Sequence, residues 1–492
     1  MSHHLPALTI IVPLIAAPLC LLVRGRKPAL GFIVAVTWAV FAMAIALIHR
    51  VVTEGVVVYR LGDWPSPWGI EYRIDMLGAF VILFVSAMGA AVGTYSTRSI
   101  AKELDERQAY LFGTVFLLCL AGLMGIAATG DMFNLFVFLE ISALSSYALI
   151  SLGRRRRALL AAFQYLVTGT IGATFILIGI GLLYMMTGTL NMAEMAEKIQ
   201  PLEHHRTVLV AFAFLTVGIS LKMAFFPLHF WLPNAYASAP SAVTAFLAST
   251  ATKVSVYIFL RFVFTIFGGA FAFRQLALDA VLMPLAIAGM FIASAVAIFQ
   301  TDLKRLLAYS SVAQIGYMVL GASLANVAGL TGAIVHMFNH ALTKGGLFLA
   351  VGCLMHRYGS SKLDDLRGAG RTMPYTSLAI ALGGLGLIGV PTTAGFVSKW
   401  YLVSGAFDRG LWPVAAMILL SSLLAVVYVW RIVETLYLKE PADPHKTVRE
   451  APLPLLIPTL LVIGASLWFG LSTSWSVGFA SQAASELLGS HP

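Results

Sequence analysis

The sequence predicts an all-α polytopic membrane protein with about fourteen transmembrane helices. Hydrophobic residues make up 59% of the chain and charged residues only 11%, whereas a soluble domain carries about 25% charged residues. Apolar runs of roughly 20 residues, the length that a helix needs to cross a bilayer, recur along the chain. Lysine and arginine gather in alternate loops, as in inner-membrane proteins. An ordinary soluble domain is therefore excluded.

The expected spans have boundaries that are soft by a few residues. They are 5–23, 29–49, 76–97, 109–129, 132–151, 158–187, 207–229, 240–262, 280–300, 304–324, 328–355, 374–404, 411–437 and 453–473. The sixth is long enough to tilt, and Pro391 interrupts the twelfth. The first lacks a basic start and a small-residue cleavage site, so we expect it to be retained.

The loop charges predict the orientation. Nineteen of the 32 lysines and arginines lie in the loops after spans 1, 3, 5, 9, 11 and 13, with Lys304 and Arg305 among them, and seven lie in the opposite loops. Both termini are therefore expected on the non-cytoplasmic side of the membrane.

The net charge is +10, but the basic residues form no patch interleaved with aromatic residues, so no nucleic-acid partner is expected. The six remaining cations lie within or at the ends of spans: Lys222, Lys253, Arg261, Lys344, Lys399 and Arg431.

Glu140 and Lys222 are candidates for a buried pair. Glu140 lies about eight residues into the fifth span, where burial disfavours a lone carboxylate. Lys222 or another buried lysine is the economical partner. A pair in which each group keeps the other charged is a two-state element that can move protons. The alternative is a static bridge between helices.

Further titratable residues lie on single helix faces. Lys253 shares its face with Ser249, Thr250 and Tyr257, so this face is expected to look inward. His336, His340 and Lys344 are spaced by four and line one face of the eleventh span. A proton relay is favoured for them over core hydrogen bonding, and metal binding is the least favoured because no cysteine or nearby carboxylate accompanies the histidines.

Prolines predict two discontinuous helices. Pro227 breaks the seventh span beside Lys222, and Pro391 breaks the twelfth beside Lys399. The two spans are five apart, so they cross in opposite directions and suggest an inverted repeat. Lys399 is a candidate exit site beside a hydrated break. Arg431 and Glu434 are expected to form a structural pair within one helix or to reach the interface.

Cofactor signatures are missing from the sequence. There is no Walker loop, no dinucleotide fingerprint and no nucleophile triad context, so no cofactor or catalytic residue is expected. Cys20, Cys119 and Cys353 are far apart and form no CxxC pair, which argues against a disulfide framework, an iron–sulfur site or a zinc site.

Several blocks resemble one family. They are GDMFNLFVFLEISALSSYALI, LKMAFFPLHFWLPNAYASAPSAVTAFLASTATKVSVYIFLR, TDLKRLLAYSSVAQIGYM, HMFNHALTKGGLFLA and GLIGVPTTAGFVSKW. Roughly residues 70–440 resemble the proton-conducting, antiporter-like subunits shared by respiratory complex I, membrane-bound hydrogenases and Mrp-type cation/proton antiporters.

The resemblance implies roles for single residues. Glu140 and Lys222 are similar to the glutamate of helix 5 and its lysine partner of helix 7. Lys253 resembles the connecting lysine of helix 8, His336 and Lys344 the relay of helix 11, and Lys399 the terminal lysine of helix 12. One complex I subunit of this type is expected to carry glutamate where Lys399 stands, and GDMFNLFVFLE looks most like the D-type member of the Mrp antiporters.

The resemblance also implies the organisation of the chain. Three N-terminal helices (1–106) are followed by two inverted five-helix repeats, helices 4–8 (107–264) and 9–13 (279–438), and by a C-terminal helix 14 (450–492). The family works in hetero-oligomers, so other membrane subunits, protons and Na⁺ are the expected partners in a bacterial inner membrane.

Four hypotheses follow. The first is a proton-translocating subunit of a multi-subunit Na⁺/H⁺ antiporter, which is a secondary transporter and not an enzyme. The second is the equivalent subunit of a complex I-like dehydrogenase or a membrane-bound hydrogenase, part of a redox-driven pump. The others are a stand-alone solute transporter, which needs a substrate-sized pocket, and a structural subunit with static ion pairs.

Overall fold

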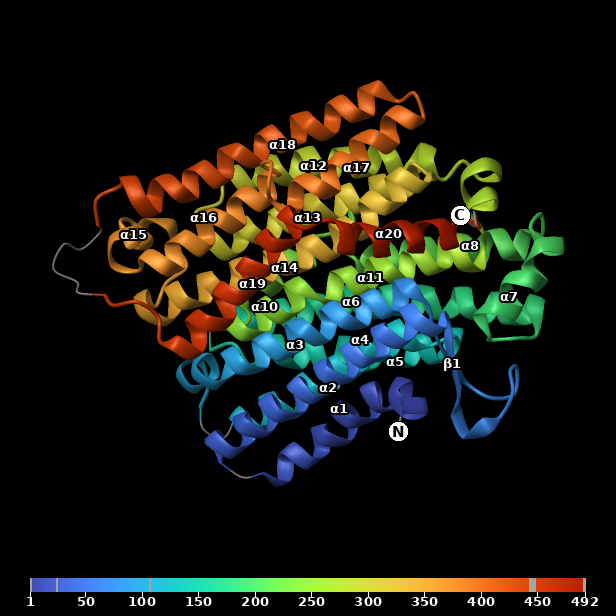
Figure 1. Ribbon diagram of the computed structural model, residues 1–492, viewed down its shortest axis with the longest axis horizontal. Helices are drawn as coiled ribbons and strands as arrows, with labels where there is room; N and C mark the ends of the chain where they lie inside the picture. Colours follow the sequence, from blue (N-terminus) through green and yellow to red (C-terminus); the bar gives the residue numbers. More distant parts are fainter. Residues whose placement is uncertain (1, 24, 106–107, 155, 442–447, 490–492) are drawn as a thin grey trace.

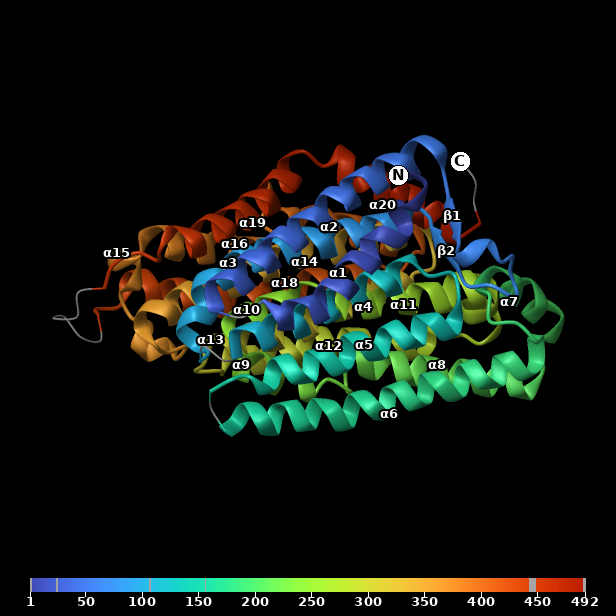
Figure 2. The same cartoon turned by 90° about the horizontal axis from the view of Figure 1, so that it is seen from below.

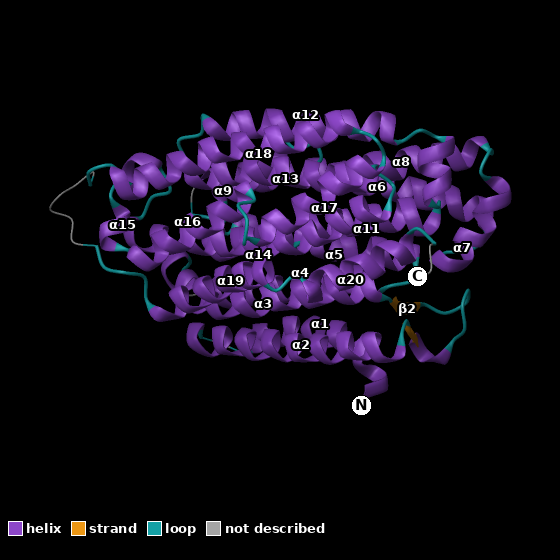
Figure 3. Ribbon diagram, turned by 45° about the horizontal axis from the view of Figure 1, so that its top comes forward, coloured by secondary structure: helices purple, strands orange, loops and turns teal. Residues whose placement is uncertain are grey.

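The computed structural model describes residues 2–23, 25–105, 108–154, 156–441 and 448–489 as one elongated helical bundle (Figures 1 and 3). Of the cations counted in loops, Arg24, Arg107, Arg155 and Lys446 lie outside these ranges. The α-helices are α1 (Leu5–Leu22), α2 (Arg26–Glu54), α3 (Met76–Glu103), α4 (Ala109–Ala128), α5 (Met132–Ser151), α6 (Arg156–Thr187), α7 (Met192–Ile199), α8 (Arg206–Lys222), α9 (Trp231–Ser238), α10 (Ser241–Ser249), α11 (Ala251–Leu260), α12 (Asp279–Ile298), α13 (Leu303–Ser323), α14 (Val327–Tyr358), α15 (Ala369–Thr372), α16 (Pro374–Ile388), α17 (Ala394–Asp408), α18 (Trp412–Val433), α19 (Leu453–Leu471) and α20 (Ser474–Leu487).

Several helices begin at a side-chain cap. The side chains of Asp75, Asp131, Asp302 and Asn326 each accept a hydrogen bond from the backbone N–H three residues further on, at the first turns of α3, α5, α13 and α14. Such caps satisfy donors that the helix itself leaves free. Within apolar runs, helices are favoured because lipid offers no partner for backbone N–H and C=O groups.

Eleven helices in the described part of the chain are long and apolar enough to cross a membrane. The expected spans missing from this set are 207–229, 328–355 and 374–404, which the structure forms as α8 with the break that follows it, α14, and α16 with α17. These are the segments that carry Lys222, the histidines with Lys344, and Lys399. The polytopic α-helical class is confirmed, and the number of fourteen spans stays a prediction.

Helix α14 lies at the centre of the bundle. Every residue from Gly329 to Leu354 is buried, and α13, α17, α10, α19 and α16 pack around the helix. In contrast, α6 is peripheral (Figure 2) and exposes large apolar side chains such as Phe163 at 60% and Leu160 at 57%. An apolar outer surface of this kind suits contact with lipid or with other membrane subunits.

The two ends of the bundle differ. One end carries the β1–β2 hairpin, α7 and the C-terminal end of α20, and we call it the terminal face (Figure 1). The hairpin pairs β1 (Val57–Arg60) with β2 (Glu71–Ile74) in antiparallel register, Val57 opposite Ile74. It was not predicted, because two strands of four residues give too short an alternation to stand out among apolar helices.

Both predicted helix breaks are present. Helix α8 ends at Lys222 and α9 begins at Trp231, with Pro227 between them. Helix α16 ends at Ile388 and α17 begins at Ala394, with Pro391 between them. A third, unpredicted interruption separates α10 from α11 at Thr250, whose backbone has φ −120° and ψ −62°. The Thr250 hydroxyl donates to the Phe246 carbonyl at 2.7 Å, a contact that often bends helices.

Lys304 does not belong with the loop cations. It lies in the first turn of α13 and is only 1% exposed, and its Nζ donates to the Ala239 carbonyl at 2.8 Å. Its assignment to a loop is therefore wrong, because the chain between α9 and α10 folds over it and supplies the Ala239 carbonyl as an acceptor.

Candidate functional site

Glu140 and Lys222 form an ion pair inside the bundle. Glu140 lies in the middle of α5 and Lys222 is the last residue of α8, and Lys222 Nζ donates to Glu140 Oε1 at 3.1 Å. The lysine side chain is 4% exposed, whereas the glutamate is 25% exposed. The predicted partner of Glu140 is therefore correct. The lysine is desolvated, so its charge depends on the carboxylate beside it.

Lys253 lies at the third break. It is fully buried, and its Nζ donates to the Ala248 carbonyl across the interruption at Thr250 and to the Thr252 hydroxyl at 3.4 Å. The predicted inward-facing polar side of this helix is thus present. No carboxylate forms an ion pair with Lys253 among the described residues.

Helix α14 presents its three titratable residues to neighbouring helices. The rings of His336 and His340 stack with centroids 5.8 Å apart and an angle of 4° between their planes. His336 Nδ1 is 2.7 Å from the Ser398 hydroxyl on α17, next to Lys399. Lys344 Nζ donates to the Leu307 carbonyl at 2.7 Å and to the Ser310 hydroxyl, both on α13. The stripe therefore connects α14 with two helices.

Lys399 lies across the break between α16 and α17. Its Nζ donates to the carbonyls of Leu387 at 3.0 Å and Ile388 at 2.8 Å, and to the Ser422 hydroxyl at 2.9 Å. It also lies 4.8 Å from the centroid of the Tyr317 ring. These carbonyls belong to the C-terminal end of α16, which carries a partial negative charge and favours a cation.

The buried cations thus fall into two kinds of environment. Lys222 is neutralised by a carboxylate, whereas Lys253, Lys344 and Lys399 donate to carbonyl and hydroxyl oxygens, with no ion pair found in the part of the chain that the structure describes. An ammonium group removed from water without a counter-charge is costly. Lysine, unlike arginine, can avoid this cost by releasing its proton.

The structure gives no cluster of three or more histidine, cysteine, aspartate and glutamate side chains that could hold a metal ion, within the described ranges. Cys20, Cys119 and Cys353 are buried and unpaired.

Glu434 pairs with Lys439 at 3.7 Å, and Arg431 donates instead to the carbonyls of Ile298 and Gln300. Of the two arrangements expected for Arg431 and Glu434, the pair within one helix is therefore not formed.

One buried ion pair was not predicted. Arg261, at the end of α11, donates to both carboxylate oxygens of Asp75, and its Nη1 is 2.6 Å from Asp75 Oδ2. The partners are 186 residues apart in the chain. Arg261 stood out in the sequence as a cation at the end of a span, but nothing in its own segment pointed to Asp75.

A polytopic bundle with charged side chains in its interior and helices broken beside them belongs to the class of membrane proteins that conduct ions. Residues 129–425 match the family described as NADH:quinone oxidoreductase/Mrp antiporter, transmembrane region. The chain belongs to this family.

Two curated relatives cover nearly the whole chain. It is 42% identical to the N-type subunit of the NADH-quinone oxidoreductase of Desulforudis audaxviator, over 94% of this chain and 95% of the relative. It is 32% identical to the D-type subunit of the Na(+)/H(+) antiporter of Bacillus subtilis, over 90% of this chain and 88% of the relative. Among solved structures, a chain of the Mrp complex from Dietzia sp. is similar with a TM-score of 0.90 and 28% identity, covering 99% of this chain and 97% of that one.

Proposed function

We propose that this protein is the proton-translocating membrane subunit of a multi-subunit Na⁺/H⁺ antiporter, a secondary transporter with no catalytic activity of its own. The observation that carries the proposal is that three buried lysines, Lys253, Lys344 and Lys399, donate hydrogen bonds to uncharged oxygens. The relatives named as D-type subunits of such antiporters and the similarity to a chain of the Mrp complex support it.

The relay comprises Glu140, Lys222, Lys253, His336, His340, Lys344 and Lys399. Protons would pass between groups that hold them with different strength: an amine facing a carboxylate, an amine at a helix interruption, two imidazoles, an amine hydrogen-bonded to α13, and an amine at a helix end. Lysine and histidine suit this task because burial and neighbouring charges decide whether they carry a proton.

The breaks support an inverted repeat. Each of the two proline-containing breaks adjoins a buried lysine, Lys222 at the end of α8 and Lys399 within α17. We infer fourteen helices with repeats over helices 4–8 and 9–13, and a bacterial inner-membrane location with both termini on the non-cytoplasmic side. In this arrangement the terminal face is the outer one.

Partners complete the transporter. The relatives are named as subunits, and the structural neighbour is part of a complex. We infer that this chain assembles with other membrane subunits, and that Na⁺ is the cation exchanged for protons. Peripheral helices such as α6 offer apolar faces for subunits or lipid.

A second function has a specific observation in its favour. The relative with 42% identity is named as a subunit of NADH-quinone oxidoreductase. The same relay would then serve a redox-driven proton pump, and oxidation of an electron donor on other subunits would drive it.

The test uses the complete complex, purified through a tag on this chain and reconstituted in vesicles with an imposed proton gradient. Addition of Na⁺ is expected to release protons from the vesicles, and Lys399→Ala is expected to abolish this flux while all subunits still co-purify. Proton uptake that requires NADH and not Na⁺, together with co-purified iron–sulfur subunits, would favour the second function. Full flux in Lys399→Ala would contradict the relay in both.

A further inference from the structure

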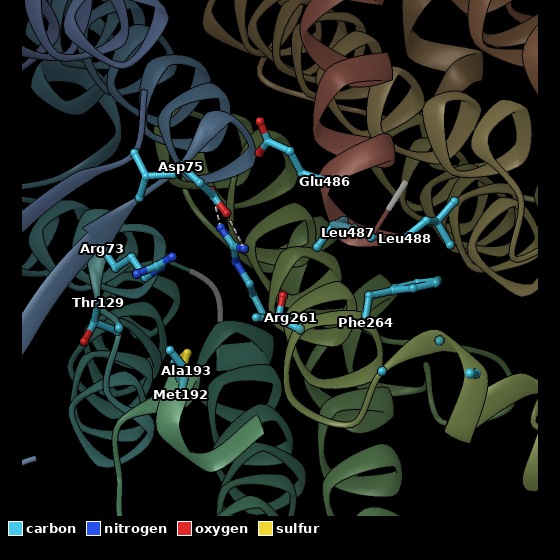
Figure 4. Close-up of a pocket in the computed structure, with 17 residues that line it drawn as sticks. Arg73, Asp75, Thr129, Met192, Ala193, Arg261, Phe264, Glu486, Leu487 and Leu488 are labelled. Carbon is cyan, nitrogen blue, oxygen red and sulfur yellow. Dashed lines mark hydrogen bonds and ion pairs between the residues drawn. The ribbon is translucent and has the colours of Figure 1, made fainter. Parts of the chain in front are cut away.

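A cavity of about 680 Å³ lies at the terminal face (Figure 4). Its wall combines β2, the start of α3, the loop between α4 and α5, the start of α7, the π-helical segment η5 (Arg261–Ile266) and the end of α20. Asp75 and Arg261 face each other across dashed contacts in Figure 4, with Arg73 and Glu486 on either side. The Thr265 hydroxyl also lines the cavity, and it has no hydrogen-bond partner among the described residues. The lining therefore combines charged and hydroxyl groups with apolar side chains such as Phe264 and Leu488.

The ion pair at the wall is firmly held. Arg261 reaches both oxygens of Asp75, its Nε donates to the Tyr257 hydroxyl at 3.0 Å, and Asp75 also accepts from the Gly78 N–H at 2.8 Å. Burial by itself would raise the pKa of Asp75, but the Arg261 guanidinium and the Gly78 N–H outweigh it and hold the pKa below its usual value. The carboxylate therefore stays charged and neutralises the arginine.

The pair is the outer end of a polar line on one helix face. Lys253 and Tyr257 on α11 and Arg261, the first residue of η5, follow one another at intervals of four residues, so they lie on the same side of this span. Eight residues of helix rise about 12 Å, which separates the mid-bundle lysine from the cavity by about two turns. Between them, the Tyr257 hydroxyl donates to the Ala127 carbonyl at 3.1 Å and accepts from Arg261.

The same span, through α10, reaches the opposite end of the bundle. The Ser241 N–H, at the start of α10, donates to Glu103 Oε2 at 2.8 Å. The segment from Ser241 to Ile266 is long and apolar enough to span a membrane. Lys253 lies near its middle, and the cavity lies at the end that η5 forms.

We propose that this cavity is a water-filled vestibule that connects Lys253 with the aqueous phase at the terminal face, and that Asp75 keeps it permeable to protons by neutralising Arg261. The inference deepens the proposed function and rests on it. A static ion pair needs no cavity beside it, whereas here the Asp75 side chain is 19% exposed and borders the open volume. Without Asp75, the unpaired guanidinium would stand at the inner end of the vestibule and repel an approaching proton.

The charged and titratable groups around the pair agree with this role. Arg73 from β2 and Glu486 from α20 line the cavity with opposite signs, and Tyr257 is the titratable neighbour on α11. Arg261 cannot pass a proton itself, because a guanidinium stays protonated. Water in the vestibule and the Tyr257 hydroxyl, which can accept one proton while releasing another, would carry it to Lys253.

The first test is accessibility. Ala193 lines the cavity and Ala196 lies on the same helix α7 outside the lining, so Ala193→Cys and Ala196→Cys form a matched pair. The three native cysteines are buried. A membrane-impermeant, positively charged thiosulfonate reagent is added to the complete complex in vesicles, on the side that an N-terminal tag occupies. We expect Ala193→Cys to react and lose Na⁺-linked proton flux by about tenfold, whereas labelled Ala196→Cys keeps its flux.

The second test is charge balance. We expect Asp75→Asn to lower proton flux by about tenfold, and the double variant Asp75→Asn with Arg261→Gln, which removes both charges, to regain most of it. No reaction at Ala193→Cys, or reaction without loss of flux, would overturn the vestibule, and so would normal flux in Asp75→Asn. A wild-type complex without Na⁺-linked flux would overturn the proposed antiport instead, and labelling of Ala193→Cys would still decide whether water reaches the cavity.

Discussion

Lys399 Nζ donates to the Ile388 carbonyl at 2.8 Å, so a lysine of one half-helix binds the end of the other half across the break that contains Pro391. The contact places a removable positive charge at the negative end of α16. Protonation of Lys399 and the geometry of the break are therefore coupled.

We predict that Lys399→Met lowers Na⁺-linked proton flux by about tenfold or more. Lys399→Arg should lower the flux as well, because arginine keeps its proton. Flux is measured in vesicles that hold the complete complex. Lys439→Met, which removes an exposed lysine paired with Glu434, serves as the control and keeps its flux. Wild-type flux in Lys399→Arg would show that a fixed charge is sufficient.

Gly389 gives a second test of the same break. Its φ is +85°, and a Cβ atom there would lie 2.9 Å from Cδ of Lys399. Gly410 also has a positive φ, +69°, but a Cβ would meet nothing within 4 Å. Each change to alanine should cost about 1–2 kcal/mol of stability through the backbone. We expect only Gly389→Ala to lose proton flux as well, and equal flux in both variants would contradict the coupling.

Glu140 should control the charge of Lys222. In Glu140→Gln the lysine, 4% exposed, loses its counter-charge and releases its proton, so we predict loss of flux with the complex still assembled. The matched control is Glu194→Gln, which breaks the ion pair with Lys198 on α7, a lysine that is 45% exposed. Assembly is checked by co-purification. If Glu140→Gln transports like the wild type, the pair is a static bridge.

Ser398 positions the histidine stripe. We predict that Ser398→Ala, which removes the 2.7 Å contact with His336 Nδ1, slows proton flux several-fold without loss of the fold. Ser466→Ala removes a comparable 2.8 Å contact between a serine and Thr343 of the same helix α14, but touches no histidine. Flux and thermal unfolding are measured for both. Equal effects would mean that Ser398 only packs α14.

Sequence reasoning succeeded for features that residues close together in the chain determine. Proline marked the breaks at Pro227 and Pro391, and spacing by four placed His336, His340 and Lys344 on one face. The interruption at Thr250 carries no proline or glycine, and it depends on hydroxyl groups that bond back to the helix. A serine or threonine in an apolar helix does so in many places without breaking it.

Two other long-range contacts could not be predicted from the sequence. Nothing near Arg261 points to Asp75, and nothing near Lys304 shows that it is covered by the chain around Ala239. The adjacent glycines of α14 also meet distant residues: a Cβ at Gly345 would come within 2.3 Å of Met88, and one at Gly346 within 2.5 Å of Ile463. They allow close packing in a helix that continues through them.

The most direct test of the buried relay is proton flux through the complete complex with Lys253→Met, which has nearly the same volume and no charge. Lys198→Met on the exposed part of α7 is the control. The relay predicts that Lys253→Met assembles normally and loses Na⁺-linked proton flux by at least about tenfold, while Lys198→Met transports like the wild type. Wild-type flux in an assembled Lys253→Met complex would contradict a proton route through the buried lysines.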